Sequence, residues 1–216
     1  MTNFTANELE AARRIFAGEF VFVAGAGSAA SLPPMQGVEI AFAGRSNVGK
    51  SSLINALTNR TALARVSRTP GRTREINFFA GQRNLVLADL PGYGFAKAPK
   101  EKIEAWTGLV RDYLVGRANL ARVLVLIDAR HGLKPNDADV LDALDRAAAS
   151  YAIVLTKADE LTKPELDNRL AETTAAIARR PAAFPLVYPT SSHDGAGIPE
   201  LRAAILRVLT EHSPIK

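Results

Sequence analysis

The amino-acid sequence predicts an α/β protein, with a mostly parallel sheet, helices on both faces and one antiparallel hairpin at the sheet edge. From residue 38 onward, apolar runs alternate with amphipathic helical segments. The runs at residues 123–127 and 151–155 are continuously apolar, as parallel strands covered on both faces require. A glycine-rich loop follows the strand at residues 38–43 and leads into a helix. Such alternation is typical of sheets that bind ligands at the carboxyl ends of their strands.

The first 37 residues predict an extension, because a segment this short cannot bury a core of its own. Residues 7–17 carry apolar side chains at helical spacing, and residues 20–24 are apolar and extended. Residues 24–37 are rich in glycine, alanine, serine and proline, which is typical of a connector. We therefore expect residues 1–37 to pack on the core of a domain formed by residues 38–216.

The elements of that domain follow from hydrophobic periodicity and turn residues. Gly81 and Gln82 mark the turn of the predicted hairpin. The expected strands are residues 38–43, 76–80, 84–88, 123–127, 151–155 and 186–188. The expected helices are residues 52–57, 100–115, 136–149, 164–178 and 198–209.

Composition limits the class of protein. The chain has 216 residues, of which 47% are hydrophobic, and no cysteine, which excludes disulfides and thiolate metal sites. No apolar run is long enough to span a membrane, so we expect a cytoplasmic protein. The net charge is +5, and no acidic residue lies between Ala41 and Arg74. This basic stretch favours a phosphate-rich partner, although a solvated basic surface is the alternative. Its basic residues are Arg45, Lys50, Arg60, Arg65, Arg68, Arg72 and Arg74.

The loop after the first domain strand fits the phosphate-binding pattern G-x-x-x-x-G-K-[ST]. Its glycines let backbone N–H groups point at phosphate oxygens, and the following helix adds its positive end. Lys50 is expected to bridge the β- and γ-phosphates, and the Ser51 hydroxyl to bind Mg²⁺. The alternative is a glycine-rich turn that matches by chance. The P-loop consists of Gly44, Arg45, Ser46, Asn47, Val48, Gly49, Lys50 and Ser51.

A second motif of the form D-x-x-G follows the strand at residues 84–88. It consists of Asp89, Leu90, Pro91 and Gly92. The Asp89 carboxylate is suited to hold Mg²⁺ through water, and the Gly92 N–H to meet a γ-phosphate. The alternative is an ordinary Pro-Gly turn after a strand.

Two further polar motifs follow later strands. Asp159 can accept two hydrogen bonds from guanine N1–H and N2–H₂, which adenine cannot supply, and the Lys157 stem can cover the base. The backbone N–H groups after the last strand can reach guanine O6. The alternative is a polar loop that caps the next helix. The two motifs are Thr156, Lys157, Ala158 and Asp159, and Thr190, Ser191 and Ser192.

The four motifs, in this order at the ends of strands, resemble the small GTPase superfamily of P-loop proteins. More narrowly, the chain is similar to the EngB (YihA/YsxC) family of bacterial ribosome-biogenesis GTPases. The similarity extends over residues 38–209 and partly over the extension. The sequence motifs that carry this similarity are Gly44-Arg45-Ser46-Asn47, Thr69-Pro70-Gly71-Arg72-Thr73, Ile76-Asn77-Phe78-Phe79, Asp89-Leu90-Pro91-Gly92-Tyr93-Gly94 and Thr156-Lys157-Ala158-Asp159.

The resemblance implies a P-loop G domain that hydrolyses GTP to GDP with Mg²⁺. It implies action as a monomer on the large ribosomal subunit or its assembly intermediates, through rRNA and ribosomal proteins, and a link to cell division and septation. Competing functions are an NTP-dependent RNA-modifying or phosphotransfer enzyme and a non-catalytic nucleotide-binding module.

The resemblance also implies site residues between the P-loop helix and the hairpin. Thr73 corresponds to the threonine that closes over the γ-phosphate and gives Mg²⁺ a second protein ligand after Ser51; Thr69 is the competing candidate. Lys50, Thr73 and Gly92 are thereby the expected catalytic residues. Thr156 stands where most GTPases have asparagine, but threonine is usual in this family. The nucleotide-lining residues of this segment are Gly71, Arg72, Thr73, Arg74 and Glu75.

Hydrolysis is expected to be slow, because Tyr93 stands where Ras-type GTPases keep a water-orienting glutamine. Arg72 and Arg74 are candidate arginine fingers, partner contacts or solvated side chains. Asn47 is a candidate ligand for K⁺ at the phosphates, or a residue that bonds its own backbone. The residues from Asp128 to His131 are interpreted as bracing of their loop.

Overall fold

The computed structural model describes residues 3–64, 75–93 and 100–212, and the side chains of all of these except residues 100–107. The described helices and strands agree with the alternation that the sequence predicts. The helices are α1 (Ala6–Ala17), α2 (Lys50–Thr58), α3 (Lys100–Gly116), α4 (Pro135–Arg146), α5 (Lys163–Ile177) and α6 (Ile198–His212), with 3₁₀ turns η1 (Ala29–Ser31), η2 (Gln82–Asn84) and η3 (Ala158–Glu160). The strands are β1 (Val21–Ala26), β2 (Val38–Gly44), β3 (Ile76–Ala80), β4 (Leu85–Asp89), β5 (Leu120–Asp128), β6 (Tyr151–Thr156) and β7 (Ala183–Pro189).

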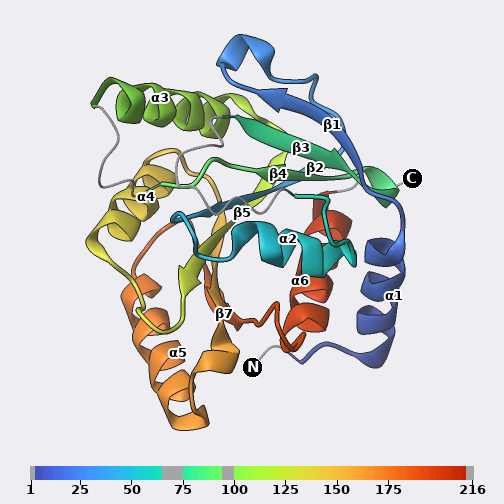
Figure 1. Ribbon diagram of the computed structural model, residues 1–216, viewed down its shortest axis with the longest axis vertical. Coiled ribbons are helices and arrows are strands. Elements are labelled where there is room, and N and C mark those ends of the chain that lie inside the picture. The colour runs from blue at the N-terminus through green and yellow to red at the C-terminus, as the bar shows by residue number, and fades with distance from the viewer. Residues whose placement is uncertain (1–2, 65–74, 94–99, 213–216) are drawn as a thin grey trace.

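A seven-stranded sheet forms the centre of the molecule, in the order β1-β3-β4-β2-β5-β6-β7 (Figure 1). The five strands from β4 to β7 in this order are parallel. β3 runs antiparallel to both β4 and β1. The predicted α/β fold, with a mostly parallel sheet and an antiparallel hairpin, is confirmed. No helix of the described residues is both long and apolar enough to cross a membrane.

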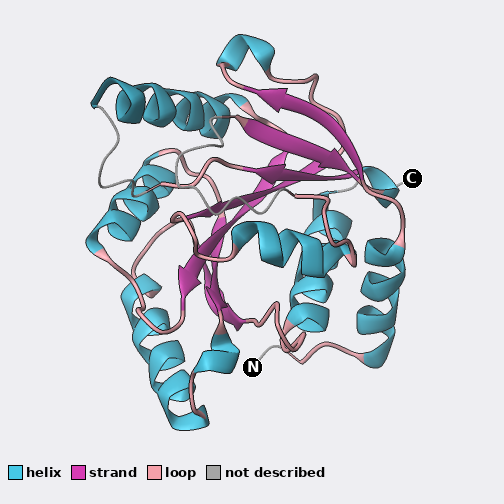
Figure 2. Ribbon diagram, in the orientation of Figure 1, coloured by secondary structure: helices cyan, strands magenta, loops and turns pink. Residues whose placement is uncertain are grey.

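Helices cover the sheet on both faces (Figure 2). α1, α2 and α6 pack against one another on one face, where α1 and α6 make the larger contact. α3, α4 and α5 contribute to a second hydrophobic cluster on the other face. β2 and β6 lie between the two layers and are buried along their whole length, which explains their largely apolar sequences; Glu39 is the charged exception in β2.

Element boundaries differ from the expected ones by a few residues. α4 ends at Arg146 rather than at residue 149, because Ala148 adopts a left-handed backbone with φ of 50° that a helix cannot continue through. β4 begins at Leu85 rather than at Asn84, which belongs to the 3₁₀ turn η2. Local backbone geometry at these ends depends on packing that periodicity does not report.

The first 37 residues contribute to both the sheet and a helical layer. β1 is the outermost strand beside β3, and its register shifts between Phe22 and Ala24. α1 begins with a capping box between Thr5 and Glu8 and packs on α6, where Arg207 donates to Glu8 at 2.7 Å. The division of the chain at residue 37 into extension and domain remains a prediction.

A buried polar cluster fixes the start of β2. The Glu39 carboxylate is paired with Arg117, and the two side chains are 1% and 4% exposed. Tyr113 donates to Glu39 at 3.0 Å and Asn119 donates at 3.1 Å. Arg117 also donates to the Pro33 carbonyl at 2.6 Å, so this cluster ties the connector of the first 37 residues to the sheet.

Candidate functional site

All four predicted motifs lie at one edge of the parallel sheet. They follow β2, β4, β6 and β7, whose carboxyl ends point the same way because these strands are parallel. The register pairs Gly44 with Leu126 on β5, and Asp128 with Thr156 on β6. The sequence prediction that these loops meet at one edge is therefore consistent with the geometry.

The P-loop joins β2 to α2 through a sharp turn that needs glycine at two points. A Cβ at Gly44 would lie 2.8 Å from Val48 Cγ1 and 3.1 Å from Leu126 Cβ. Gly49, the N-cap of α2, has φ of 101°. Asn47 also has positive φ, 64°, which asparagine tolerates better than most residues. The first N–H groups of α2 have no partner within the helix, so the turn presents donors suited to an oxyanion.

Lys50 and Asp89 bring the first and second motifs into contact. The Lys50 ammonium is hydrogen-bonded to Asp89 Oδ1, and their side chains are 10% and 7% exposed. Lys50 opens α2, and Asp89 is the last residue of β4. The predicted phosphate-binding lysine therefore lies against the predicted Mg²⁺-associated carboxylate, and both side chains are partly desolvated.

The second motif is bonded to the P-loop through its backbone. Ser46 N donates to the Tyr93 carbonyl at 3.1 Å, and Tyr93 N donates to the Gly44 carbonyl at 3.2 Å. Gly92 packs against Ser46, since a Cβ at Gly92 would lie 3.2 Å from Ser46 Oγ. The Ser46 hydroxyl is itself buried and, among the residues that the structure describes, finds no hydrogen-bond partner.

The Tyr93 side chain connects this motif to α4. Its hydroxyl donates to Asp137 Oδ1 at 2.9 Å, and both residues are buried. Burial, and then the charge of Asp137, raise the pKa of Tyr93 far above its usual range, so the phenol stays protonated. Asp137 also accepts from Lys134 N at 2.8 Å at the start of α4. Sequence reasoning identified Tyr93 but not Asp137, which is 44 residues away and carries no pattern that would pair them.

The third motif is bonded to the P-loop by two of its side chains. Thr156 Oγ1 donates to the Val48 carbonyl at 2.7 Å. Lys157 Nζ donates to the Asn47 carbonyl at 3.2 Å. The loop that the sequence assigns to the base and the loop that it assigns to the phosphates are thus held at a fixed separation, as recognition of one nucleotide requires.

The third and fourth motifs are also joined. Ala158 N donates to the Thr190 carbonyl at 3.1 Å, and Thr190 donates to the Leu155 carbonyl through both its N–H and its hydroxyl. Thr190 and Ser191 are buried, whereas Ser192 is exposed. Among the described residues, the His193 ring lies beside Asp159, with Nδ1 at 3.9 Å from Oδ2.

Asp128, at the end of β5, contacts the third motif, which the sequence did not predict. Its carboxylate accepts from Lys157 Nζ at 2.9 Å and from Arg130 Nη2 at 2.7 Å. Burial pushes the pKa of Asp128 upward, but the hydrogen bonds from Arg130 and Lys157 outweigh it and hold this pKa well below its usual range. The interpretation of residues 128–131 as loop bracing did not include the contact with Lys157.

Several predicted site residues lie outside the described part of the chain. These are Thr69, Gly71, Arg72, Thr73 and Arg74. Glu75 is described: it is exposed just before β3, and its carboxylate lies beside Gly25 of β1, where a Cβ would come within 2.7 Å of Glu75 Oε2. The proposed roles of these residues remain predictions.

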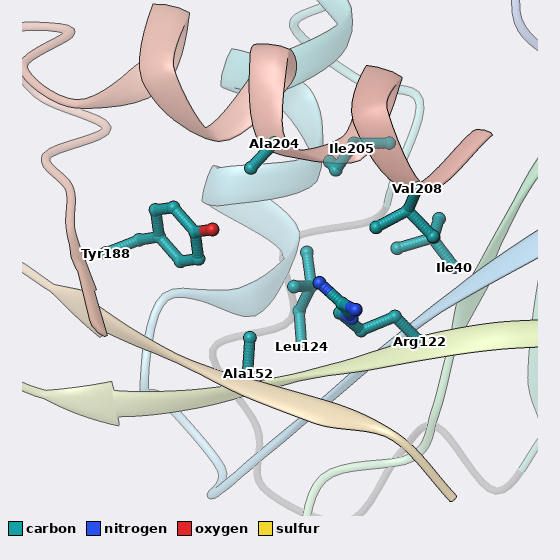
Figure 3. A pocket seen from close by; sticks show the side chains of 8 residues that line it. All are labelled: Ile40, Arg122, Leu124, Ala152, Tyr188, Ala204, Ile205 and Val208. Carbon is teal, nitrogen blue, oxygen red and sulfur yellow. The ribbon is translucent and has the colours of Figure 1, made fainter. Parts of the chain in front are cut away.

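A small cavity under α6 is distinct from this site (Figure 3). It has a volume of about 10 Å³, room for roughly one water molecule. Arg122 enters it from β5, stacks over the Phe184 ring at 4.1 Å and has a pKa lowered by burial. The cavity is lined by Ile40, Arg122, Leu124, Ala152, Tyr188, Ala204, Ile205 and Val208. A nucleotide needs a far larger space, so this cavity belongs to the packing between the sheet and α6.

Comparison with known proteins places these motifs in a sequence family. Residues 39–157 match the family model described as "50S ribosome-binding GTPase". The chain is 59% identical over 207 residues to the probable GTP-binding protein EngB of Bradyrhizobium diazoefficiens, which covers 95% of each chain. It is 58% identical over 213 residues to the probable GTP-binding protein EngB of Nitrobacter winogradskyi, which covers 98% of each chain.

Solved structures share the fold. The crystal structure of a probable GTP-binding protein engB superposes with a TM-score of 0.63 at 28% identity, over 81% of this chain and 100% of that chain. Aquifex aeolicus Era bound to GDP.AlF4- superposes with a TM-score of 0.65 at 22% identity, over 84% of this chain and 60% of the Era chain. The second likeness concerns the fold alone.

Proposed function

This chain belongs to the EngB family of GTP-binding proteins, and on that premise we propose that it is a GTP-hydrolysing switch in assembly of the large ribosomal subunit. GTPase activity is the property of the family. The observation that carries the ribosomal proposal is the match of residues 39–157 to a family described as ribosome-binding. We also propose, from the family resemblance, that the protein acts as a cytoplasmic monomer.

Phosphate binding is assigned to the P-loop and Lys50. In the described structure the Lys50 ammonium is neutralised by Asp89. A bound phosphate offers the same ammonium a stronger, multiply charged partner, so nucleotide loading exchanges the Lys50–Asp89 pair for a Lys50–phosphate contact. The Ser46 hydroxyl beside Gly92 is buried and finds no partner within the described part of the chain, which supports placement of the terminal phosphate near these two residues.

Mg²⁺ is assigned to Ser51, in the first turn of α2, with Asp89 holding it through water. Hydroxyl and carboxylate oxygens are suitable ligands for Mg²⁺, and Asp89 becomes available once Lys50 turns to the phosphates. When bound, the ion neutralises charge on the β- and γ-phosphate oxygens. Thr73 is the proposed second protein ligand.

Base recognition is assigned to Asp159, Lys157 and the backbone N–H of Ser192, because the N–H groups of Thr190 and Ser191 already donate to the Leu155 and Ala196 carbonyls. Asp159 lies in the turn η3, which begins directly after Lys157. The backbone of Lys157 has φ of 57°. The hydrogen bonds that fix these loops to the P-loop support their placement at the far end of one nucleotide.

Slow hydrolysis is proposed because Tyr93 does not offer a water-orienting amide. Its hydroxyl is held by Asp137 in a buried position, so the side chain is engaged on α4. Phosphoryl transfer depends on positioning and charge neutralisation, and the chain would need a further positive group for a fast reaction. Arg72 and Arg74 remain the candidates for such a group in cis.

Association with ribosomal particles is the test of the proposed function. Purified protein is sedimented with large subunits in a GTP analogue or GDP at several salt concentrations. We expect tighter binding with the GTP analogue, and Arg65→Ala, Arg68→Ala and Arg74→Ala together should weaken it and lower the salt slope by about 2–3.

The matched control replaces Arg13, Arg14 and Arg111 with alanine, which lowers the net charge by the same amount. These three side chains are 59%, 75% and 75% exposed. This control should leave the salt slope of binding unchanged. Equal binding of GTP- and GDP-loaded protein to large subunits would contradict the proposed GTP-dependent switch. An unchanged salt slope in the triple variant at Arg65, Arg68 and Arg74 would mean that the basic stretch contributes only to solubility.

We further propose K⁺ as an activator held by Asn47. Among the described residues the Asn47 side chain makes no hydrogen bond, so the alternative that it bonds its own backbone finds no support there. A cation at the β–γ bridge supplies the positive charge that Tyr93 cannot.

Turnover of GTP should be about tenfold or more faster in K⁺ than in Na⁺ at equal ionic strength, as expected for an electrostatic contribution to the transition state. Asn47→Ala should abolish this difference, and Asn168→Ala on the exposed face of α5 should retain it. Equal wild-type rates in both salts, with and without ribosomal particles, would reject the proposal. Stimulation that survives Asn47→Ala would reject Asn47 as the ligand.

A further inference from the structure

Asp128, at the end of β5, and Arg130 shortly after it are charged residues that the proposed mechanism does not use. Asp128 is 13% exposed at its side chain and accepts hydrogen bonds from two cations. Oδ2 receives Lys157 Nζ at 2.9 Å and Arg130 Nη2 at 2.7 Å, and Oδ1 receives Arg130 Nε at 2.9 Å and Arg130 N at 3.1 Å. One carboxylate therefore orients both side chains.

Lys157 spans the space between this carboxylate and the P-loop. Its Nζ bonds Asp128 on one side and the Asn47 carbonyl on the other. The side chain is 27% exposed, so it is confined without being buried. These two acceptors hold the tip of the flexible four-carbon side chain. The lysine has therefore already lost rotamer freedom before a base packs on it, and loses less on binding.

Arg130 extends the network to the turn that carries Asp159. Arg130 Nη1 donates to Glu160 Oε2 at 2.8 Å, and Glu160 is the residue after Asp159 in η3. Both guanine-facing residues are thus connected to Asp128, Lys157 directly and Asp159 through Glu160 and Arg130. Without the Asp128 charge, Lys157 would keep the Asn47 carbonyl and Arg130 would keep Glu160, but nothing would join the two side chains.

We propose that Asp128, with the Arg130–Glu160 pair as its second arm, is a positioning residue that holds Lys157 and η3 ready for a guanine base. This inference rests on the proposed assignment of Lys157 and Asp159 to base recognition. It gives Asp128 an effect on nucleotide affinity, since ordering the site before binding reduces the entropy lost on binding. It gives Asp128 no part in the chemistry at the phosphates.

Asp128→Asn tests the proposal, because it keeps the shape and removes the charge. We expect GDP affinity to fall about tenfold, through faster dissociation. The KM for GTP should rise while kcat stays unchanged, because the variant loses only the ordering of the base site before the nucleotide binds. Glu160→Gln should lower GDP affinity about twofold to threefold, since the Arg130–Glu160 pair is more exposed. Glu172→Gln is the matched control on α5: this exposed carboxylate is paired only with half-buried Arg169 among the described residues, and its change should leave GDP affinity as in the wild type.

A double-mutant comparison separates positioning from a general loss of structure. In a Lys157→Met background, Asp128→Asn should lower GDP affinity by no more than about twofold to threefold, because only the Arg130–Glu160 arm is left for it to orient. An equal loss in both backgrounds, or a parallel fall in kcat and thermal stability, would overturn the proposal. Asp128→Glu should recover part of the affinity.

The parent assignment is checked in the same assay. If Asp159→Asn leaves guanine preference intact, the proposed base site is wrong, whatever Asp128 does. If Asp159→Asn changes that preference while Asp128→Asn leaves GDP affinity at the wild-type value, the base site stands and the positioning role is rejected.

Discussion

Asp159→Asn should convert guanine binding into xanthine binding. The carboxylate is proposed to accept two charge-assisted hydrogen bonds from guanine, each worth about 1.5–3 kcal/mol. Their loss predicts a fall in GDP affinity of roughly 10²- to 10⁴-fold. Xanthine carries an oxygen where guanine carries N2–H₂, so the asparagine amide can donate to it. Xanthosine diphosphate should therefore become the preferred ligand.

Competition titrations with GDP, xanthosine diphosphate and ADP against a fluorescent nucleotide measure this change. Asp167→Asn, an exposed carboxylate on α5, is the matched control and should bind GDP like the wild type. Wild-type protein that binds ADP as tightly as GDP would refute the base-site assignment. It would also favour the competing hypothesis of an NTP-dependent modifying or phosphotransfer enzyme.

Glu39→Ala should cause a large loss of stability. It leaves the Arg117 guanidinium, 4% exposed, without its carboxylate, and removal of one partner of a buried ion pair costs about 3–5 kcal/mol. The Tyr113 hydroxyl, whose pKa is raised by burial and then by the Glu39 charge, also loses its acceptor. Urea unfolding followed by circular dichroism measures the change in the free energy of unfolding.

The double variant Glu39→Met/Arg117→Met should recover much of this loss, because it removes both charges together. Glu10→Gln breaks a solvent-exposed pair on α1 and should leave the unfolding midpoint in place. GDP affinity of the folded protein should hardly change, since Glu39 lies at the start of β2, about 17 Å of extended chain from the P-loop. A loss of less than about 1 kcal/mol in Glu39→Ala would contradict the buried-pair argument.

The sequence predicts the parallel sheet and the loops at its carboxyl edge well, because both depend on local patterns. Residues 123–127 of β5 and 151–155 of β6 are buried, so their continuous apolar runs identify them. The P-loop is specified by the glycines that its turn requires. The pairing of β1 with β3 was not predicted, since the strand order at an antiparallel edge depends on contacts between segments far apart in the chain.

Side-chain pairs between separate loops were the least predictable features. Tyr93 and Asp137 are 44 residues apart, and Asp128 and Lys157 are 29 apart. Each partner alone looks like an ordinary polar loop or helix-start residue. Only the three-dimensional path of the chain brings them within hydrogen-bonding distance, so no spacing rule could have identified them.

The irregular register of β1 bears on how well the outer edge of the sheet could accept a further strand. Val21, Phe22 and Val23 are 48%, 59% and 51% exposed on the outermost strand, a composition that would otherwise invite edge-to-edge growth of the sheet. The shift between Phe22 and Ala24 interrupts the row of backbone donors and acceptors that an incoming strand would have to match. This interruption makes the outer edge a poorer template for a further strand, although the strand itself is apolar.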